Sequence, residues 1–63
     1  MPSMSSRDLI KALQADGWTH VRTVGSHHHF RHPAKSGTIT VPHPRKDLKK
    51  GTLRAILKAA GLK

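Results

Sequence analysis

Four of the six histidines in this 63-residue chain fall in one internal stretch, at positions 27, 28, 29 and 32. Histidine is the side chain whose unperturbed pKa lies nearest neutrality, so an imidazole can give or take a proton at physiological pH. The chain also carries twelve Lys and Arg residues against three Asp and Glu, a net charge of +9. Such a surplus favours polyanionic partners, namely RNA, DNA or an acidic protein surface. Together these features indicate proton-transfer chemistry on a nucleic acid.

The length and composition limit the kind of site that the chain can build. Sixty-three residues form one small domain that buries only about 60% of its unfolded surface. We place this domain at residues 4–62 and treat residues 1–3 as an N-terminal extension. With one Trp, one Phe and no Tyr, the core is thin, so a functional site must be a surface patch rather than a deep pocket.

Cysteine is absent from the sequence, which excludes disulfides and thiolate zinc sites. No apolar run approaches the roughly 20 residues of a membrane-spanning helix, so we expect no membrane partner. Both features fit a protein of the reducing cytoplasm, which is the location we predict.

The hydrophobic pattern predicts a helix at each end of the chain. Residues 5–8 resemble a capping box, and an apolar stripe at helical spacing follows up to Gly17, so we expect the first helix at residues 6–16. The second helix should start with Thr52 near its N-cap and end with Gly61 near its C-cap.

Three segments between the helices are rich in β-branched and aromatic residues and predict strands at residues 18–24, 27–32 and 38–41, the last stopped by Pro42. Short turns between them predict an antiparallel meander. The order α-β-β-β-α therefore indicates an α+β fold with a three-stranded antiparallel sheet. Because neither helix has another apolar surface to bury against, both should cover one face of the sheet and leave the other face open.

The alternation of side chains along a strand divides the histidines between these two faces. Phe30 is the core anchor of the second strand, so His28 and His32 share its face, and we expect both to be packing residues. The open face then carries His27, His29 and Arg31.

Three kinds of chemistry could explain the exposed histidines: a metal site, packing, or acid–base catalysis. Zinc usually takes three or four ligands, often including Cys or carboxylate, whereas only His27 and His29 share the open face. The three acidic residues lie elsewhere in the sequence. We therefore expect no functional metal and no cofactor. For His27, the residues alone leave catalysis and phosphate contact open.

Six Lys and Arg residues lie on or near the loops that border the second strand and the second helix, where they could follow a phosphate backbone. They are Arg31, Lys35, Arg45, Lys46, Lys49 and Lys50. The alternative for this set is a general solvated surface, which is what we expect of Lys11 and Lys58 on the helix faces.

Several short motifs, taken in order, resemble the HicA toxin family of type II toxin–antitoxin systems. The resemblance covers about residues 4–62. It is carried by Leu9-Ile10 and Leu13, Asp16-Gly17-Trp18, Gly25-Ser26-His27-His28-His29-Phe30, His32-Pro33, Thr40-Val41-Pro42-His43-Pro44 and Lys50-Gly51-Thr52-Leu53.

The resemblance implies a double-stranded-RNA-binding-domain-like fold and an mRNA interferase that cleaves RNA without the ribosome and arrests growth. It also implies a HicB-type antitoxin that binds and inactivates the toxin. The functional histidine of the family is the first one after Gly-Ser, which is His27 here, and the family glycine corresponds to Gly25.

Metal-free RNA cleavage uses the 2′-OH of the substrate as nucleophile, with proton transfer by side chains and charge stabilisation by cations. We expect His27 to supply the acid–base group, with His29 as a further candidate on the same face. Gly25 and Ser26 would let the backbone approach a phosphate. Arg31 or a Lys of the 45–50 loop would stabilise the transition state.

Two other classes of function remain open at this point. One is a non-catalytic module that binds double-stranded RNA, since this type of fold usually only binds. The other is an interaction protein whose charge serves to pair with an acidic partner.

Overall fold

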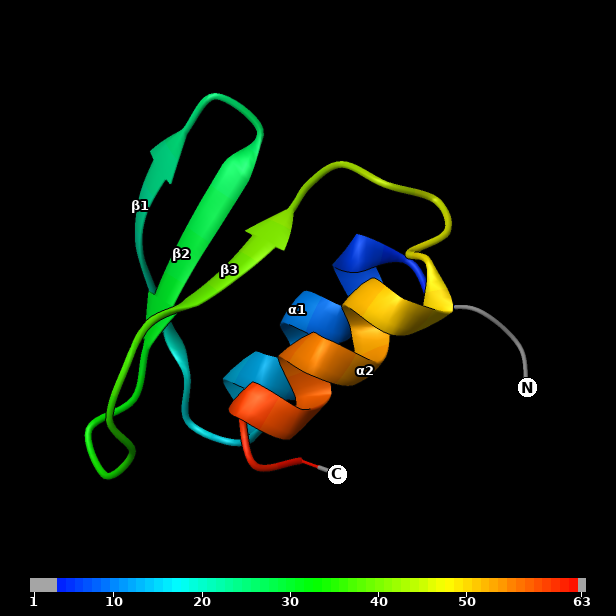
Figure 1. The fold of residues 1–63 in the computed structure, drawn as a ribbon. Helices are drawn as coiled ribbons and strands as arrows, with labels where there is room; N and C mark the ends of the chain where they lie inside the picture. Colours follow the sequence, from blue (N-terminus) through cyan, green and yellow to red (C-terminus); the bar gives the residue numbers. More distant parts are fainter. Residues whose placement is uncertain (1–3, 63) are drawn as a thin grey trace.

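The computed structural model describes residues 4–62, so the expected extension at residues 1–3 lies outside the described part. The elements are α1 (Ser6–Ala15), β1 (Thr19–Val24), β2 (His27–Arg31), β3 (Ile39–Pro42) and α2 (Lys50–Ala59) (Figure 1). The predicted α-β-β-β-α order is confirmed. The two described helices have ten residues each, and neither is long and apolar enough to cross a membrane.

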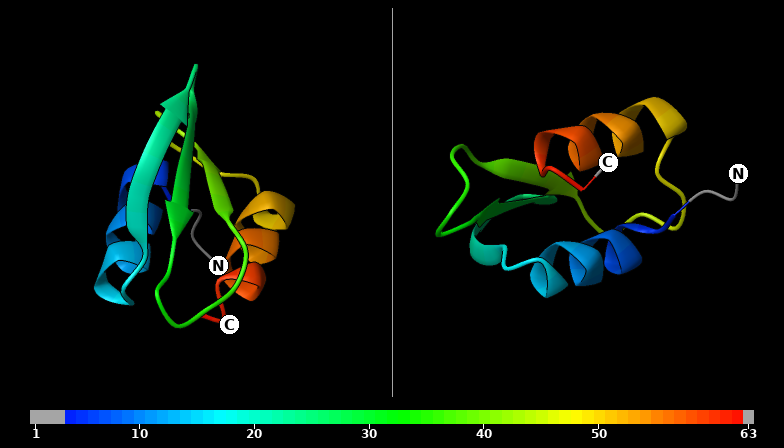
Figure 2. Two further views of the ribbon diagram at one scale, coloured as in Figure 1. Left: turned by 90° about the vertical axis from the view of Figure 1, so that its left-hand side faces the viewer. Right: turned by 90° about the horizontal axis from the view of Figure 1, so that it is seen from below.

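The three strands form one antiparallel sheet in the order β1-β2-β3. Gly25 and Ser26 make the two-residue connection of the first hairpin, so Val24 lies opposite His27. Both helices lie behind the same face of the sheet, α1 on the side of β1 and α2 on the side of β3 (Figure 2). The expected single covered face is confirmed, and the opposite face of the sheet is open.

The hydrophobic core fills the space between the sheet and the two helices. Phe30 is 1% exposed and is paired with Ile39, which is also buried. The core cluster consists of Leu9, Leu13, Trp18, Phe30, Ile39, Val41, Leu48, Ile56 and Ala60. With so few large side chains, each one contributes a substantial part of the buried area, about 1.5–3 kcal/mol per fully buried side chain.

The start and end of α1 follow local rules. The Ser5 hydroxyl accepts a hydrogen bond from the Asp8 amide at 3.1 Å, as an N-cap should. At the other end, Gly17 has φ +108° and the Trp18 amide donates to the Leu13 carbonyl, which closes the helix in a Schellman motif. Trp18, predicted as the first strand residue, is therefore part of the helix end, where its ring is 2% exposed.

Other boundaries also differ from the prediction, among them the end of α1 at Ala15 rather than at residue 16 and the start of β3 at Ile39 rather than at residue 38. α2 begins at Lys50 with Lys49 as an N-cap that has no side-chain hydrogen bond, so Thr52 is not the cap and lies inside the first turn. Pro42 is the last residue of β3 rather than the residue that stops it. β3 is an edge strand, and such a strand tolerates a residue without an amide hydrogen at its end. His32 follows β2 instead of ending it.

The connection between β2 and β3 is fastened to the ends of both helices by Lys35. Its ammonium donates to Asp16 Oδ2 at 2.6 Å and to the Ala60 carbonyl at 3.0 Å. This hydrogen bond from Lys35 holds the pKa of the Asp16 carboxyl below its usual value. The end of the molecule opposite the first hairpin is thereby tied together.

Gly17 should be the glycine least tolerant of substitution. A Cβ at this position would meet His32 Nε2 at 2.7 Å, in a backbone conformation that L residues rarely adopt. We predict that Gly17→Ala lowers the free energy of unfolding by about 1–3 kcal/mol, measured by urea denaturation. Gly51→Ala is the matched control because Gly51 is helical and its Cβ would meet nothing within 4 Å. An equal loss in both variants would contradict this reading.

Candidate functional site

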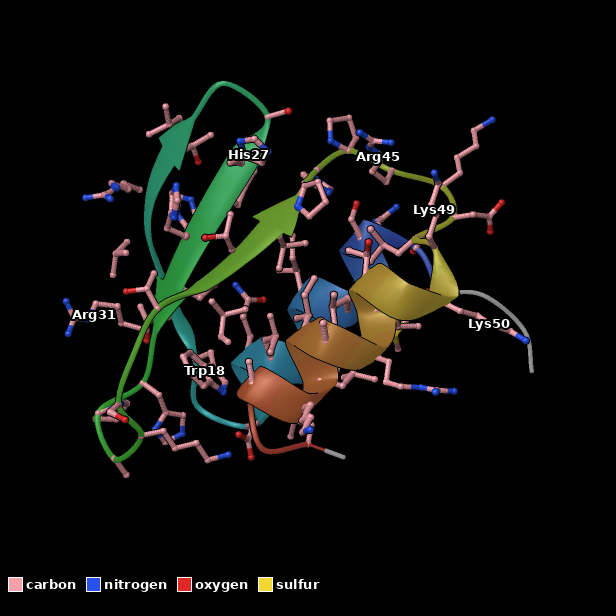
Figure 3. All side chains as sticks on the ribbon, in the orientation of Figure 1. Trp18, His27, Arg31, Arg45, Lys49 and Lys50 are labelled. Carbon is pink, nitrogen blue, oxygen red and sulfur yellow. The ribbon has the colours of Figure 1, made fainter. Side chains whose placement is uncertain are left out.

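His27 begins β2 at the tip of the first hairpin, and its side chain is exposed (Figure 3). In register it lies between Val24 of β1 and Pro42 of β3. Gly25 reaches φ +60° in the turn, and a Cβ there would meet nothing within 4 Å. The backbone of the turn is therefore open to approach by a large ligand beside the His27 imidazole.

The other candidates on the open face follow β2 away from the turn. His29 is half-buried, and its Nδ1 lies 3.0 Å from the Thr40 hydroxyl. Arg31 is paired with Thr19 near the other end of the sheet. At roughly 3.3 Å per residue its Cα is about 13 Å from that of His27, and Figure 3 shows the two side chains well apart.

His32 is a packing residue, as its predicted face indicated. Its ring meets the Trp18 ring edge-on with a centroid distance of 5.3 Å. Nδ1 accepts a hydrogen bond from the Ala34 amide at 2.9 Å, so in the neutral ring the proton is on Nε2, which donates to the Asp16 carbonyl at 2.8 Å.

His28 lies on the Phe30 side of the sheet, as predicted, but its surroundings are not those of a packing residue. It is half-buried, and its ring contacts two other histidines, His20 at 5.2 Å and His43 at 4.9 Å between ring centroids. The prediction that His28 serves packing is therefore incomplete, because β2 continues past the cover of the helices and its inner face meets polar rings.

Hydrogen bonds orient the three imidazoles of this inner-face histidine cluster (His20, His28 and His43). His20 Nε2 lies 2.7 Å from the Thr23 hydroxyl, which lies 3.4 Å from His28 Nδ1. His43 Nδ1 lies 2.6 Å from the hydroxyl of Ser6, which is 1% exposed. Neither His20 nor His43 was predicted from the sequence as a functional residue. For His43, one signal was available. The alternation of side chains around Pro42 places His43 on the face of the sheet opposite His27.

The cluster changes the protonation of its central member. Partial burial lowers the pKa of the His28 imidazole, and the nearby His43, His20 and His29 lower it further because their protonated rings repel a second positive charge. At neutral pH His28 is therefore a neutral ring, able to accept a proton or a hydrogen bond.

The structure separates the six predicted phosphate-binding cations into groups. Arg45 and Lys46 follow His43, whose amide donates to the Ser26 carbonyl at 2.7 Å, so they lie near the tip of the hairpin. Lys49 and Lys50 lie at the start of α2. Lys35 and Arg31 lie toward the opposite end, and the Lys35 ammonium is engaged with Asp16.

No three His, Asp or Glu side chains within residues 4–62 are arranged to hold a metal ion. The inner-face histidine cluster does not form such a group either, although its rings are in contact. The chemistry that these residues can support directly is proton transfer, together with binding of negative charge.

Comparisons with known proteins agree on one family. The sequence profile described as "HicA toxin of bacterial toxin-antitoxin" matches residues 6–62. Among solved structures, the chain is similar to one from a "Toxin-Antitoxin complex from Streptococcus pneumoniae", with 37% identity and a TM-score of 0.80 over 94% of this chain and 98% of that chain. It is also similar to one from a "HicA3 and HicB3 toxin-antitoxin complex", with 42% identity and a TM-score of 0.80 over 95% and 97%. No curated protein sequence gives a significant match.

The fold and these matches define a small, basic α+β domain of the toxin class found in toxin–antitoxin systems. The chain belongs to the HicA toxin family.

Acidification should destabilise the protein through His28. Its pKa in the folded state is below the unfolded value of about 6.5, so between these two values the unfolded chain binds more protons and stability falls as the pH falls. We predict that the free energy of unfolding drops between pH 7.5 and pH 5.5, and that His28→Gln reduces this drop. Urea denaturation at the two pH values measures it. The same pH dependence in both proteins would contradict the assignment.

Proposed function

We propose that this HicA-family chain is an endoribonuclease, an mRNA interferase whose acid–base group is His27. The observation that carries the proposal is an exposed imidazole at a hairpin tip with an open glycine turn on one side and the basic 43–46 segment close by. Neutral and protonated imidazole coexist near physiological pH, which suits a group that must both accept and donate a proton.

The proposed reaction needs no reagent other than the RNA itself. His27 accepts the proton of a ribose 2′-OH, and that oxygen attacks the adjacent phosphorus. The bond from phosphorus to the 5′-oxygen breaks, and the leaving oxygen takes up a proton. The products carry a 2′,3′-cyclic phosphate and a 5′-hydroxyl. His29, two residues along on the same face, is the candidate for the second proton transfer.

Backbone and side-chain groups around the turn would stabilise the charge that develops on the phosphate. The amides of Gly25 and Ser26 would donate to a phosphate that approaches the turn. Arg45 and Lys46 supply positive charge from the neighbouring segment. Arg31 is too distant to act on the same phosphate and would contact RNA further along the strand.

The start of α2 supports binding of a polyanion. Lys49 and Lys50 lie at the N-terminal end of this helix, which has no acidic residue in its first turn. Cations at this end oppose the helix dipole, and a bound phosphate would offset that unfavourable charge. We therefore include both in the RNA-binding surface and leave out Lys35, whose ammonium is already paired.

A HicB-type antitoxin is the proposed protein partner. Both structural relatives come from toxin–antitoxin complexes, one of them with HicB3. Because interfaces pair opposite charges, the net charge of +9 predicts an acidic surface on the partner. We propose that the antitoxin covers His27 and the neighbouring cations and so blocks access of RNA.

Replacing His27 tests the catalytic proposal. His27→Ala should lower the rate of RNA cleavage by at least about 10²-fold, the usual contribution of a positioned acid–base group, while RNA binding stays within about twofold. Cleavage is followed on a single-stranded RNA in excess EDTA. Val24→Ala is the matched control, since Val24 is the exposed cross-strand neighbour of His27 and its loss removes bulk without removing an imidazole.

Three outcomes would overturn this proposal. The first is cleavage that survives the substitution in His27, and the second is cleavage that requires a divalent ion. The third is tight, salt-sensitive binding of duplex RNA by the wild type without any cleavage, which would identify a non-catalytic binding module. His28→Ala and His29→Ala in the same assay show whether either neighbour carries the activity instead.

The antitoxin proposal predicts competition with RNA. An acidic HicB-type protein encoded beside this chain should form a complex that abolishes cleavage, and the complex should weaken as salt is raised from 0.1 M to 1 M because screening shortens the range of the charges. Gel filtration and the cleavage assay measure both effects. A complex that forms while cleavage continues would contradict the proposed coverage of His27.

A further inference from the structure

A hollow of about 450 Å³ lies between the start of α1 and the segment after β3, lined by residues 5–7 and 43–46. We call it the Arg7 hollow. It is a shallow surface depression that is open to solvent. Its residues come from the start of α1 and from the segment after β3. The proposed function uses Arg45 and Lys46 of this segment but gives no role to Arg7, His43 or Pro44.

Hydrogen bonds between α1 and the loop fix the walls of the Arg7 hollow. The Ser6 amide donates to the Arg45 carbonyl at 2.9 Å, and the Arg45 amide donates to the Ser6 hydroxyl at 2.8 Å. The same hydroxyl is 2.6 Å from His43 Nδ1. The shape of the hollow is therefore set before any ligand binds, which lowers the entropic cost of binding.

The residues that line the hollow combine positive charge with one aromatic ring, that of His43, and the saturated ring of Pro44. Arg7, Arg45 and Lys46 are exposed cations, and no acidic residue is among the lining residues. His43 and Pro44 contribute ring surfaces. This pairing of cations with stacking surfaces is the pattern by which proteins hold single-stranded nucleic acid, since cations contact phosphate and rings stack on a base.

His43 connects the hollow to the proposed reaction site. Its ring lines the hollow and also contacts the His28 ring, with 4.9 Å between centroids. Its amide is bonded to the Ser26 carbonyl of the hairpin turn. RNA that occupies the hollow therefore lies beside the hairpin turn, while the side chain of His27 projects from the other face of the sheet.

We propose that the Arg7 hollow binds one nucleotide of single-stranded RNA next to the phosphate that is cleaved, with Arg7 holding the phosphate and His43 and Pro44 contacting the base. The position of this nucleotide relative to the reacting phosphate rests on the proposed ribonuclease function; binding in the hollow does not. Arg7 was not among the cations assigned to RNA from the sequence.

The test measures binding and cleavage separately. Binding of a single-stranded oligonucleotide with 2′-O-methyl riboses, which cannot be cleaved by 2′-OH attack, is measured for wild type, Arg7→Ala and Arg54→Ala at one salt concentration. Arg54 is the matched control, an exposed arginine on α2. Arg7→Ala should weaken binding about five- to tenfold, the effect of one lost charge-assisted contact, whereas Arg54→Ala should change it less than about twofold.

Cleavage of the unmodified RNA then adds a second readout. Arg7→Ala should raise KM with kcat within about twofold, the opposite of the result expected for His27→Ala, and Arg7→Lys should recover most of the binding. Equal losses in Arg7→Ala and Arg54→Ala would overturn the site and leave only a general charge effect. Loss of antitoxin binding without loss of oligonucleotide binding would also overturn it and assign the hollow to the protein partner. If the wild type binds through Arg7 but never cleaves, the ribonuclease proposal fails while the binding site stands.

Discussion

The hydroxyl of Ser6 joins the parts of this small protein on which the candidate site depends. It is 1% exposed and is hydrogen-bonded to the His43 ring and to the backbone of Arg45. Through these bonds the start of α1 holds the segment after β3, and the His43 amide holds the hairpin turn at Ser26. If this buried hydroxyl lost its hydrogen-bond partners, the free energy of unfolding would fall by about 1–3 kcal/mol. The same bonds keep the hairpin tip, the inner-face histidine cluster and the basic segment in one arrangement.

The fold could be predicted from the sequence because its signals are local. The Ser5 cap, the Gly17 turn and the alternation around Phe30 each act within a few residues, and the structure confirms the elements they predicted. Trp18 was misplaced because its β-propensity was outweighed by its role at the end of α1, where it covers the core. Thr52 was misplaced because the start of α2 is set by contacts of the preceding loop, such as the bond from the Leu48 amide to the Met4 carbonyl.

The positions of the site residues could be predicted only where side chains alternate regularly between the two faces of a strand. His27, His29 and Arg31 lie on the open face as expected, but alternation fails in β1, where the register shifts between His20 and Arg22. Because of this irregularity, His20 and Thr23 lie on the same inner face and contact one another. A strand whose side chains alternate strictly between the two faces would place residues three apart on opposite faces. Ser6 and His43 are 37 residues apart in sequence, and neither composition nor spacing links them. Such contacts depend on how the elements pack.

The arrangement places an exposed imidazole, that of His27, at the tip of a hairpin in a strongly basic domain, and the proposed function makes this imidazole the group that takes the proton of the ribose 2′-OH. The measurement that tests this most directly compares one RNA with its copy that carries a single 2′-deoxyribose at the cleavage position, both in excess EDTA. The account predicts that the RNA is cut to give a 2′,3′-cyclic phosphate and a 5′-hydroxyl, and that the deoxy-substituted copy stays intact at that position. Cleavage of the substituted copy, or products with a 5′-phosphate, would contradict it.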